Sequence, residues 1–181
     1  FTSLDSVTRE LVLRVMRLAS KAHALMKGRH NKKTSSFVKA CLAYCHITIP
    51  SLDDIFSRLQ LFLLCGEVAL VNLMVVQGEA LLKAAISLLP DVPATRENHN
   101  HKVESTEPML VAFLRDFSSM ALLFPGHPKH GPFYLIKGLL NAIQAYEPWK
   151  KASEGKTRVY LGVLQLFATY AQREFPYGIP E

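Results

Sequence analysis

The stretch Val68–Leu88, VALVNLMVVQGEALLKAAISL, is apolar on nearly every side when it is wound as a helix. Its amide and charged side chains are Asn72, Gln77, Glu79 and Lys83. These interruptions argue against a membrane span, which needs about 20 predominantly apolar residues. A helix that is apolar on most sides has to be covered on most sides. We therefore expect residues 68–88 to form one helix at the centre of a helical core, with a break before it at Gly66.

Apolar residues recur at three- and four-residue steps in most of the other segments, and no segment shows the alternation typical of a strand. Helices are predicted at about 6–27, 35–48, 51–65, 107–124, 132–146 and 156–175. Residues 91–106 lack periodicity and are expected to form a long, mobile surface loop, and 176–181 form a tail. The apolar central helix fits stacked hairpins better than a bundle, whose helices all have a polar outer face. The predicted fold is therefore all-α: one HEAT-like α-solenoid segment over residues 1–175, with about seven helices in antiparallel hairpins.

Three of these helices have an apolar face that we expect to be buried. In the first helix the face consists of Val7, Leu11, Val15, Leu18, Ala22 and Leu25. In the helix 107–124 it consists of Leu110, Phe113, Leu114, Phe117, Met120 and Ala121. In the last helix it consists of Tyr160, Val163, Leu164, Phe167 and Tyr170.

Positive charge is concentrated at the start of the chain. The 181 residues carry a net charge of +6, and residues 1–33 contain eight Lys or Arg against two acidic residues. No aromatic residue lies between Phe1 and Phe37, whereas nucleic-acid-binding surfaces usually combine basic and aromatic side chains. The basic patch is therefore interpreted as a solvated face or a contact for an acidic protein, not as a nucleic-acid site. Its residues are Arg14, Arg17, Lys21, Lys27, Arg29, Lys32 and Lys33.

Potential metal ligands are each better explained without a metal. They are Cys41 and Cys45 with His46, His99 and His101, and His127 and His130. Free cysteine is common in cores, and the loop histidines have no cysteine or carboxylate at supporting spacing. Three cysteines are too few and odd in number for a disulfide framework, which favours reduced thiols in the cytoplasm. Nucleophile, phosphate-loop and zinc-protease motifs are absent from the sequence, so we predict neither an enzyme nor a cofactor.

The outer faces of two predicted helices are candidates for protein contacts. In the helix 132–146 an exposed tyrosine stands beside polar side chains, and tyrosine is favoured at interfaces. The candidate residues there are Tyr134, Lys137, Asn141 and Gln144. A second group in the central helix consists of Asn72, Glu79 and Lys83. An ordinary solvated face with one tyrosine is the alternative interpretation.

Three stretches of the sequence resemble a known family. They are KTSSFVKACLAYCHITIPSL (33–52), KAAISL (83–88) with the prolines that follow, and FPGHP (124–128) running on to GLLNAIQ (138–144). Together they resemble the C-terminal half of the vacuolar protein sorting-associated protein 35-like family, the large scaffold subunits of the endosomal Retriever complex. The resemblance covers most of residues 1–175 in the same order, and weakens at 94–107 and 149–155.

This resemblance implies a HEAT-like α-solenoid without catalysis, part of the Commander assembly that recycles membrane cargo from endosomes. It implies a cytoplasmic, endosome-associated protein that reaches the membrane through its complex. In that family the C-terminal solenoid curls around a phosphoesterase-fold subunit, and a separate N-terminal part holds an arrestin-fold subunit. We therefore expect this chain to bind the phosphoesterase-fold subunit and not the arrestin-fold subunit. The family continues at both ends, so we expect the sequence, which starts at Phe1, to be a piece of a longer protein.

A function of a different class remains open. The basic first helix and the turn after it are also typical of an adaptor that binds anionic membrane or RNA. Such binding would weaken steeply as salt rises to the physiological range, whereas a protein–protein interface would change modestly.

Overall fold

A computed structural model of the chain describes residues 2–97, 101–127, 129–149 and 153–172. The chain forms two compact units, residues 1–88 and 89–181, and each is described by itself. The described residues form seven α-helices and one short two-stranded ribbon. The predicted all-α fold class is therefore confirmed.

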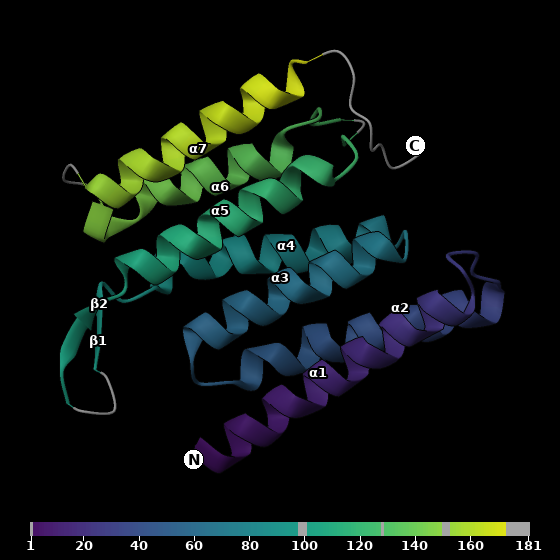
Figure 1. The fold of residues 1–181 in the computed structure, drawn as a ribbon. Coiled ribbons are helices and arrows are strands. Elements are labelled where there is room, and N and C mark those ends of the chain that lie inside the picture. Colours follow the sequence, from purple (N-terminus) through teal and green to yellow (C-terminus); the bar gives the residue numbers. More distant parts are fainter. Residues whose placement is uncertain (1, 98–100, 128, 150–152, 173–181) are drawn as a thin grey trace. The chain divides into compact units, whose positions relative to one another are not determined.

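The first unit begins with a helical hairpin. Helix α1 (Thr2–Leu25) and helix α2 (Lys32–Thr48) run in opposite directions and pack against each other (Figure 1). Asn31 caps α2: its side chain accepts from the Thr34 N–H at 2.9 Å, and its own N–H donates to Thr34 Oγ1 at 3.0 Å. This reciprocal pair satisfies two backbone donors at the helix start. The helix therefore begins at Lys32, three residues before its predicted start at about 35.

A second hairpin follows, made of α3 (Ile55–Val71) and α4 (Val75–Leu88). Asp54 starts α3 by accepting from the Ser57 N–H at 2.8 Å. The two helices approach closely at Gly66, where a Cβ atom would lie 2.9 Å from Leu82 Cδ2. Gly66 therefore serves close packing inside α3, and the helix break predicted there is wrong.

The break between α3 and α4 lies six residues later. The N–H of Leu73 donates to Leu70 O at 2.8 Å, and the N–H of Met74 donates to Ala69 O at 2.8 Å. This is a Schellman C-cap, which needs a left-handed residue at its turn. Leu73 takes that conformation, with φ +57°. The single helix predicted over 68–88 is therefore wrong: it joins the end of α3 to α4, and this joining made it look apolar all round.

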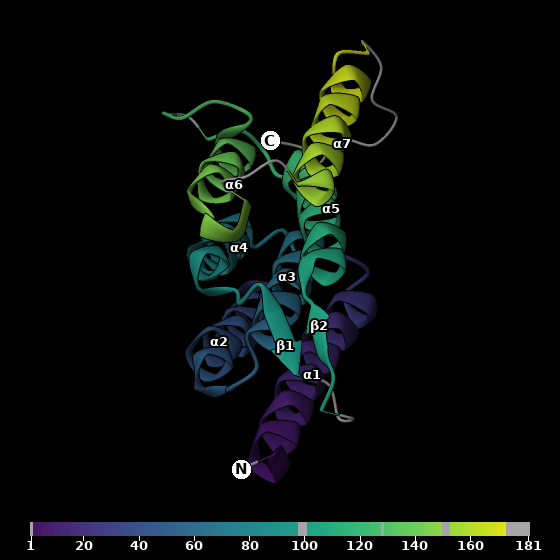
Figure 2. The same ribbon diagram turned by 90° about the vertical axis from the view of Figure 1, so that its left-hand side faces the viewer.

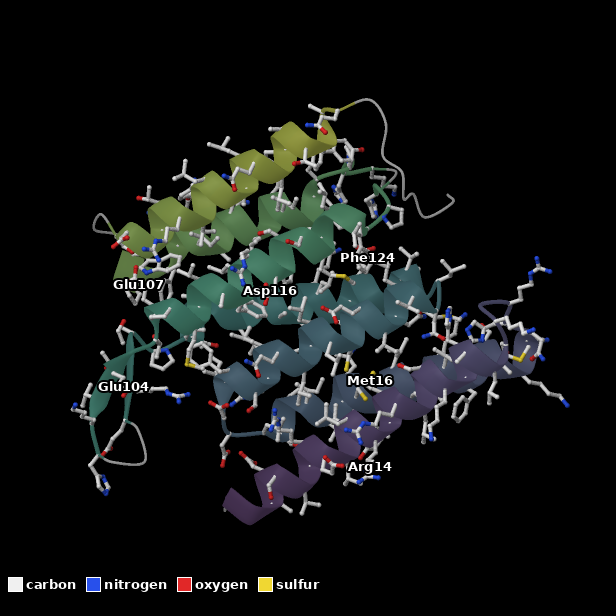
Figure 3. All side chains as sticks on the ribbon, viewed as in Figure 1. Arg14, Met16, Glu104, Glu107, Asp116 and Phe124 are labelled. Carbon is white, nitrogen blue, oxygen red and sulfur yellow. The ribbon has the colours of Figure 1, made fainter. Side chains whose placement is uncertain are left out.

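The two hairpins of the first unit stack on each other. Helix α3 packs on α1, and both α3 and α4 contact α2. Helix α1 contributes Val12, Met16 and Ala19, each at most 2% exposed. In Figure 3, Met16 lies on the side of α1 toward α3, and Arg14 lies on the outer side. This stacking of hairpins is the HEAT-like arrangement expected from the sequence.

The buried face of α1 differs from the predicted face. Among the residues expected in the core, Val7 is 54% exposed, Leu11 48%, Leu18 50% and Leu25 83%. The helix is apolar on two sides, because Val12, Met16 and Ala19 form a second stripe. Periodicity alone cannot decide which of two apolar stripes is covered.

The described residues of the second unit form three α-helices and the ribbon. Helices α5 (Glu107–Leu123), α6 (Tyr134–Ala145) and α7 (Glu154–Tyr170) pack with α5 against both others. Single 3₁₀ turns cover Leu89–Asp91 and Glu147–Trp149. The face predicted for α5 is buried in full, with every residue at most 6% exposed. In α7 the prediction holds only in part: Val163 is buried, but Leu164 is 62% and Tyr170 43% exposed.

The segment predicted as an unstructured loop contains the ribbon. Strands β1 (Thr95–Glu97) and β2 (Val103–Ser105) pair antiparallel, with Arg96 opposite Glu104 (Figure 2). All six residues are exposed, so no alternation of apolar and polar residues marks them as strands. Residues 98–100 and the predicted tail at 176–181 lie outside the described residues. The single segment over 1–175 stays a prediction.

Candidate protein-contact surfaces

The polar face of α6 presents the predicted contact residues together. Lys137, Asn141 and Gln144 are exposed and Tyr134 is half-buried. Their steps of three and four residues place them along one side of the helix. The opposite side is fixed in the core by Leu135, Ile136, Leu139 and Ile143, each at most 2% exposed. The buried side therefore holds the polar side in one orientation.

A cluster of rings forms the N-terminal end of this face. The His127 ring lies 4.5 Å from the His130 ring and 5.4 Å from the Tyr134 ring, measured between centroids. The turn is tight: the His127 N–H donates to Gly131 O at 3.2 Å, and Gly131 has φ +78°. We name the cluster and the four polar residues of α6 the α6 surface.

The α6 surface has the chemistry of a protein contact. The amides of Asn141 and Gln144 both donate and accept hydrogen bonds, and Lys137 adds a positive charge. Tyr134 and the two histidine rings provide flat area that loses little conformational entropy on binding.

The second predicted group is only partly on the surface. Lys83 pairs with Glu79 at 2.5 Å, one turn apart on α4. Asn72 is 1% exposed, and its Nδ2 donates to Val68 O at 2.7 Å at the end of α3. Asn72 is therefore corrected from a contact residue to a helix-terminating one.

The predicted basic patch lies on the first hairpin and is exposed throughout. Its members are Arg14, Arg17, Lys21, Lys27, Arg29, Lys32 and Lys33. Arg14 pairs with Glu10 at 2.6 Å, which partly neutralises that end of the patch. The remaining members gather toward the α1–α2 turn.

The cysteines lie in the core of the first unit. Cys41, Cys45 and Cys65 are buried and free. Burial and the neighbouring Cys45 raise the pKa of the Cys41 thiol. A hydrogen bond with Cys45, together with burial, raises the pKa of Cys65. A raised pKa keeps the thiols of Cys41 and Cys65 protonated, and a protonated thiol is a poor nucleophile and a poor metal ligand.

The histidines near these cysteines and in the loops do not assemble a metal site in the described part of the chain. His46 is exposed, and its ring packs 6.0 Å from that of Phe62. His101 Nδ1 lies 2.6 Å from Glu97 Oε1 on the ribbon, and His99 is outside the described residues. No group of three or more His, Cys, Asp or Glu among the described residues could hold a metal ion.

Two surfaces were missed by the sequence analysis. One is the exposed apolar side of α1, formed by Leu4, Val7, Leu11, Leu18 and Leu25. The other is a groove between α5 and α7, formed by adjoining clefts of about 480 and 380 Å³ that share Val111, Arg115 and Arg158. Gly155 and Gly162 line these clefts. Their spacing of two helical turns, which places two residues without side chains on the same side of α7, was the signal in the sequence.

Comparison with known proteins assigns the chain to a family. The sequence profile of the VPS35L C-terminal domain matches residues 1–181. The chain belongs to this family.

Relatives named "VPS35 endosomal protein-sorting factor-like" occur in distantly related organisms. The zebrafish (Danio rerio) protein is 45% identical over 181 residues, which cover 100% of this chain and 19% of that protein. The human protein is 45% identical over 179 residues, which cover 99% of this chain and 18% of that protein. The Dictyostelium discoideum protein, "VPS35 endosomal protein sorting factor-like", is 42% identical over 179 residues. These cover 99% of this chain and 18% of that protein. The chain thus spans less than a fifth of the length of these relatives.

The family membership confirms the resemblance noted from the sequence. The names of these relatives describe them as endosomal protein-sorting factors. Among the described residues, no helix is both long and apolar enough to cross a membrane.

Proposed function

We propose that the chain is a non-catalytic scaffold segment of Retriever, within the Commander assembly that recycles cargo from endosomes. It presents helical faces to the phosphoesterase-fold subunit of that complex. Its place is the cytoplasmic side of the endosome, held there through the complex. The arrestin-fold subunit is not a partner of this segment, because the family holds that subunit with its N-terminal part.

The α6 surface is the observation that carries this proposal. Its four polar residues share one side of a helix whose other side is buried. A rigid surface loses little entropy on binding, so more of the contact energy appears as affinity. Family membership supports the sorting role, and the α6 surface supplies a contact of suitable chemistry.

The α4 pair belongs to the proposal in a secondary role. Lys83 is 55% exposed at its side chain and Glu79 18%. Because they already pair with each other, a partner would gain little from either charge alone. We therefore expect the loss of Lys83 to weaken binding less than the loss of Tyr134.

The test is calorimetric titration of the chain with the phosphoesterase-fold subunit. The double variant Tyr134→Ala with Lys137→Glu is expected to weaken binding by about tenfold or more, because a central aromatic anchor typically contributes at least that much. The matched control is Tyr44→Ala with Lys39→Glu on α2, where both residues are exposed. Equal affinity for the two double variants would remove the α6 surface from the interface.

A further inference from the structure

From Leu11 onward, the hairpin of α1 and α2 carries charge of one sign. Residues 11–52 contain eight Lys or Arg and neither Asp nor Glu. Five of these cations are exposed close to the turn: Lys21, Lys27, Arg29, Lys32 and Lys33. This stretch therefore offers no carboxylate to neutralise them. We name these five residues together with Leu25 the hairpin tip.

The backbone of the hairpin tip has a defined conformation. The N–H of Lys27 donates to Ala24 O at 3.1 Å, and the N–H of Gly28 donates to His23 O at 3.1 Å. These bonds close α1 with a Schellman C-cap, and Lys27 and Gly28 have φ +49° and +75°. Figure 3 shows nitrogen-bearing side chains projecting outward from this end of the hairpin. The cations are thus presented on a structured protrusion.

An aliphatic side chain stands among the cations. Leu25 is 83% exposed, the largest exposed fraction among the large apolar side chains described. Basic side chains beside an exposed aliphatic one are the pattern of a membrane-surface contact. Cations attract anionic headgroups. Transfer of an aliphatic side chain from water to the boundary with the acyl chains lowers its free energy.

We infer that the hairpin tip binds the surface of an anionic membrane. Lysine and arginine side chains contact the lipid headgroups, and Leu25 enters the acyl boundary. A nucleic acid is the less favoured ligand, since residues 2–36 contain no Phe, Tyr or Trp on which bases could stack. The inference is independent of the proposed function, because the α6 surface takes no part in it.

Vesicle co-sedimentation of the chain tests this inference. Vesicles of three parts phosphatidylcholine to one part phosphatidylserine are expected to bind it, and vesicles of phosphatidylcholine alone are not. Reversing Lys27, Arg29, Lys32 and Lys33 to Glu is expected to weaken binding by on the order of a hundredfold or more, at about fivefold for each cation lost near such a surface. Leu25→Ser keeps the charge and is expected to weaken binding by about tenfold.

A control with the same change in net charge separates the hairpin tip from overall charge. Reversal of Arg96, Lys102, Arg115 and Lys129 to Glu, all exposed and in the second unit, is expected to leave most of the binding intact. Circular dichroism checks that each variant is folded. Equal losses in the two reversed variants would overturn the inference. Binding that is unchanged in Leu25→Ser, together with tighter binding to a single-stranded RNA than to the vesicles, would overturn it in favour of RNA.

Discussion

The carboxylate of Glu107, at the start of α5, accepts a hydrogen bond from the backbone N–H of Gly155, at the start of α7, at 2.8 Å. The same oxygen accepts from the Ser153 hydroxyl. Figure 3 shows Glu107 beside the first turn of α7. One carboxylate therefore joins two helices and satisfies an N–H at a helix start, where the helix dipole favours negative charge. Because the carboxylate occupies the space beside Gly155, this position has no room for a side chain.

Gly155→Ala is expected to destabilise the chain by about 1–3 kcal/mol, because the new methyl group overlaps the Glu107 carboxylate and forces it away. The matched control is Gly162→Ala, also in α7, where a Cβ meets nothing within 4 Å. That variant is expected to stabilise by about 0.5–1 kcal/mol, since alanine favours a helix more than glycine does. Urea denaturation followed by circular dichroism measures both. A stabilising Gly155→Ala would contradict the contact.

The assignment of the buried side of α1 can be tested by truncation. Met16→Ala is expected to cost about 2–4 kcal/mol, because Met16 is 2% exposed and its loss leaves a cavity. Leu11→Ala is expected to change the unfolding free energy by less than about 0.5 kcal/mol, because Leu11 is 48% exposed. Thermal unfolding of both variants distinguishes the two sides. If the larger cost fell on Leu11, the side first predicted from the periodicity would be the buried one.

Because the backbone at Leu73 is left-handed, a glycine there should not lower the stability of the chain. Leucine in that region costs roughly 1 kcal/mol, and Leu73 is 56% exposed, so Leu73→Gly gives up little packing. We expect Leu73→Gly to be neutral or to stabilise by up to about 1 kcal/mol. Ala80→Gly is the control: Ala80 is exposed in the interior of α4, and glycine there costs roughly 0.5–1 kcal/mol relative to alanine. Chemical denaturation measures the change in unfolding free energy for both variants, and only the control is expected to be destabilised. A destabilised Leu73→Gly would contradict the C-cap at this turn.

The burial of Tyr146 leads us to expect a loss of stability at alkaline pH. Burial raises the pKa of Tyr146 above its ordinary value; Thr106 opposes this shift, and the charge of Glu107 adds to it. The unfolded chain therefore releases the phenol proton at a lower pH than the folded chain does. This contribution to stability is complete below the unfolded pKa of about 10 and falls as the pH rises past it. Tyr146→Phe is expected to show a weaker fall in the unfolding free energy across this range, and an identical fall in both proteins would exclude the tyrosine as its source.

The sequence predicted best the helices that have one clear apolar side. Helix α5 begins next to Pro108, has one clear apolar side, and was predicted with its complete buried face. The polar side of α6 was predicted for the same reason, because only one side of that helix is apolar. Where a single stripe is apolar, periodicity determines both sides of a helix.

The incorrect predictions have physical causes that differ from case to case. At Leu73 the chain turns through backbone hydrogen bonds with a leucine in the left-handed conformation, so no glycine marks the turn. Gly66 looked like a break, but its missing side chain serves the contact with Leu82. In α1 two apolar stripes compete, and only the packing of α3 decides between them. The α5–α7 groove depends on two helices far apart in the sequence, so the glycine spacing in α7 points to only one of its two walls.

Hydrogen exchange of the chain, alone and with the phosphoesterase-fold subunit, tests the central proposal most directly. The account predicts slower exchange of the amides of Tyr134–Ala145 and of the preceding histidine turn when the subunit is bound, with exchange in α2 unchanged. Unchanged exchange throughout α6 under saturating subunit, with slowing confined to the exposed side of α1 or to the α5–α7 groove, would contradict it.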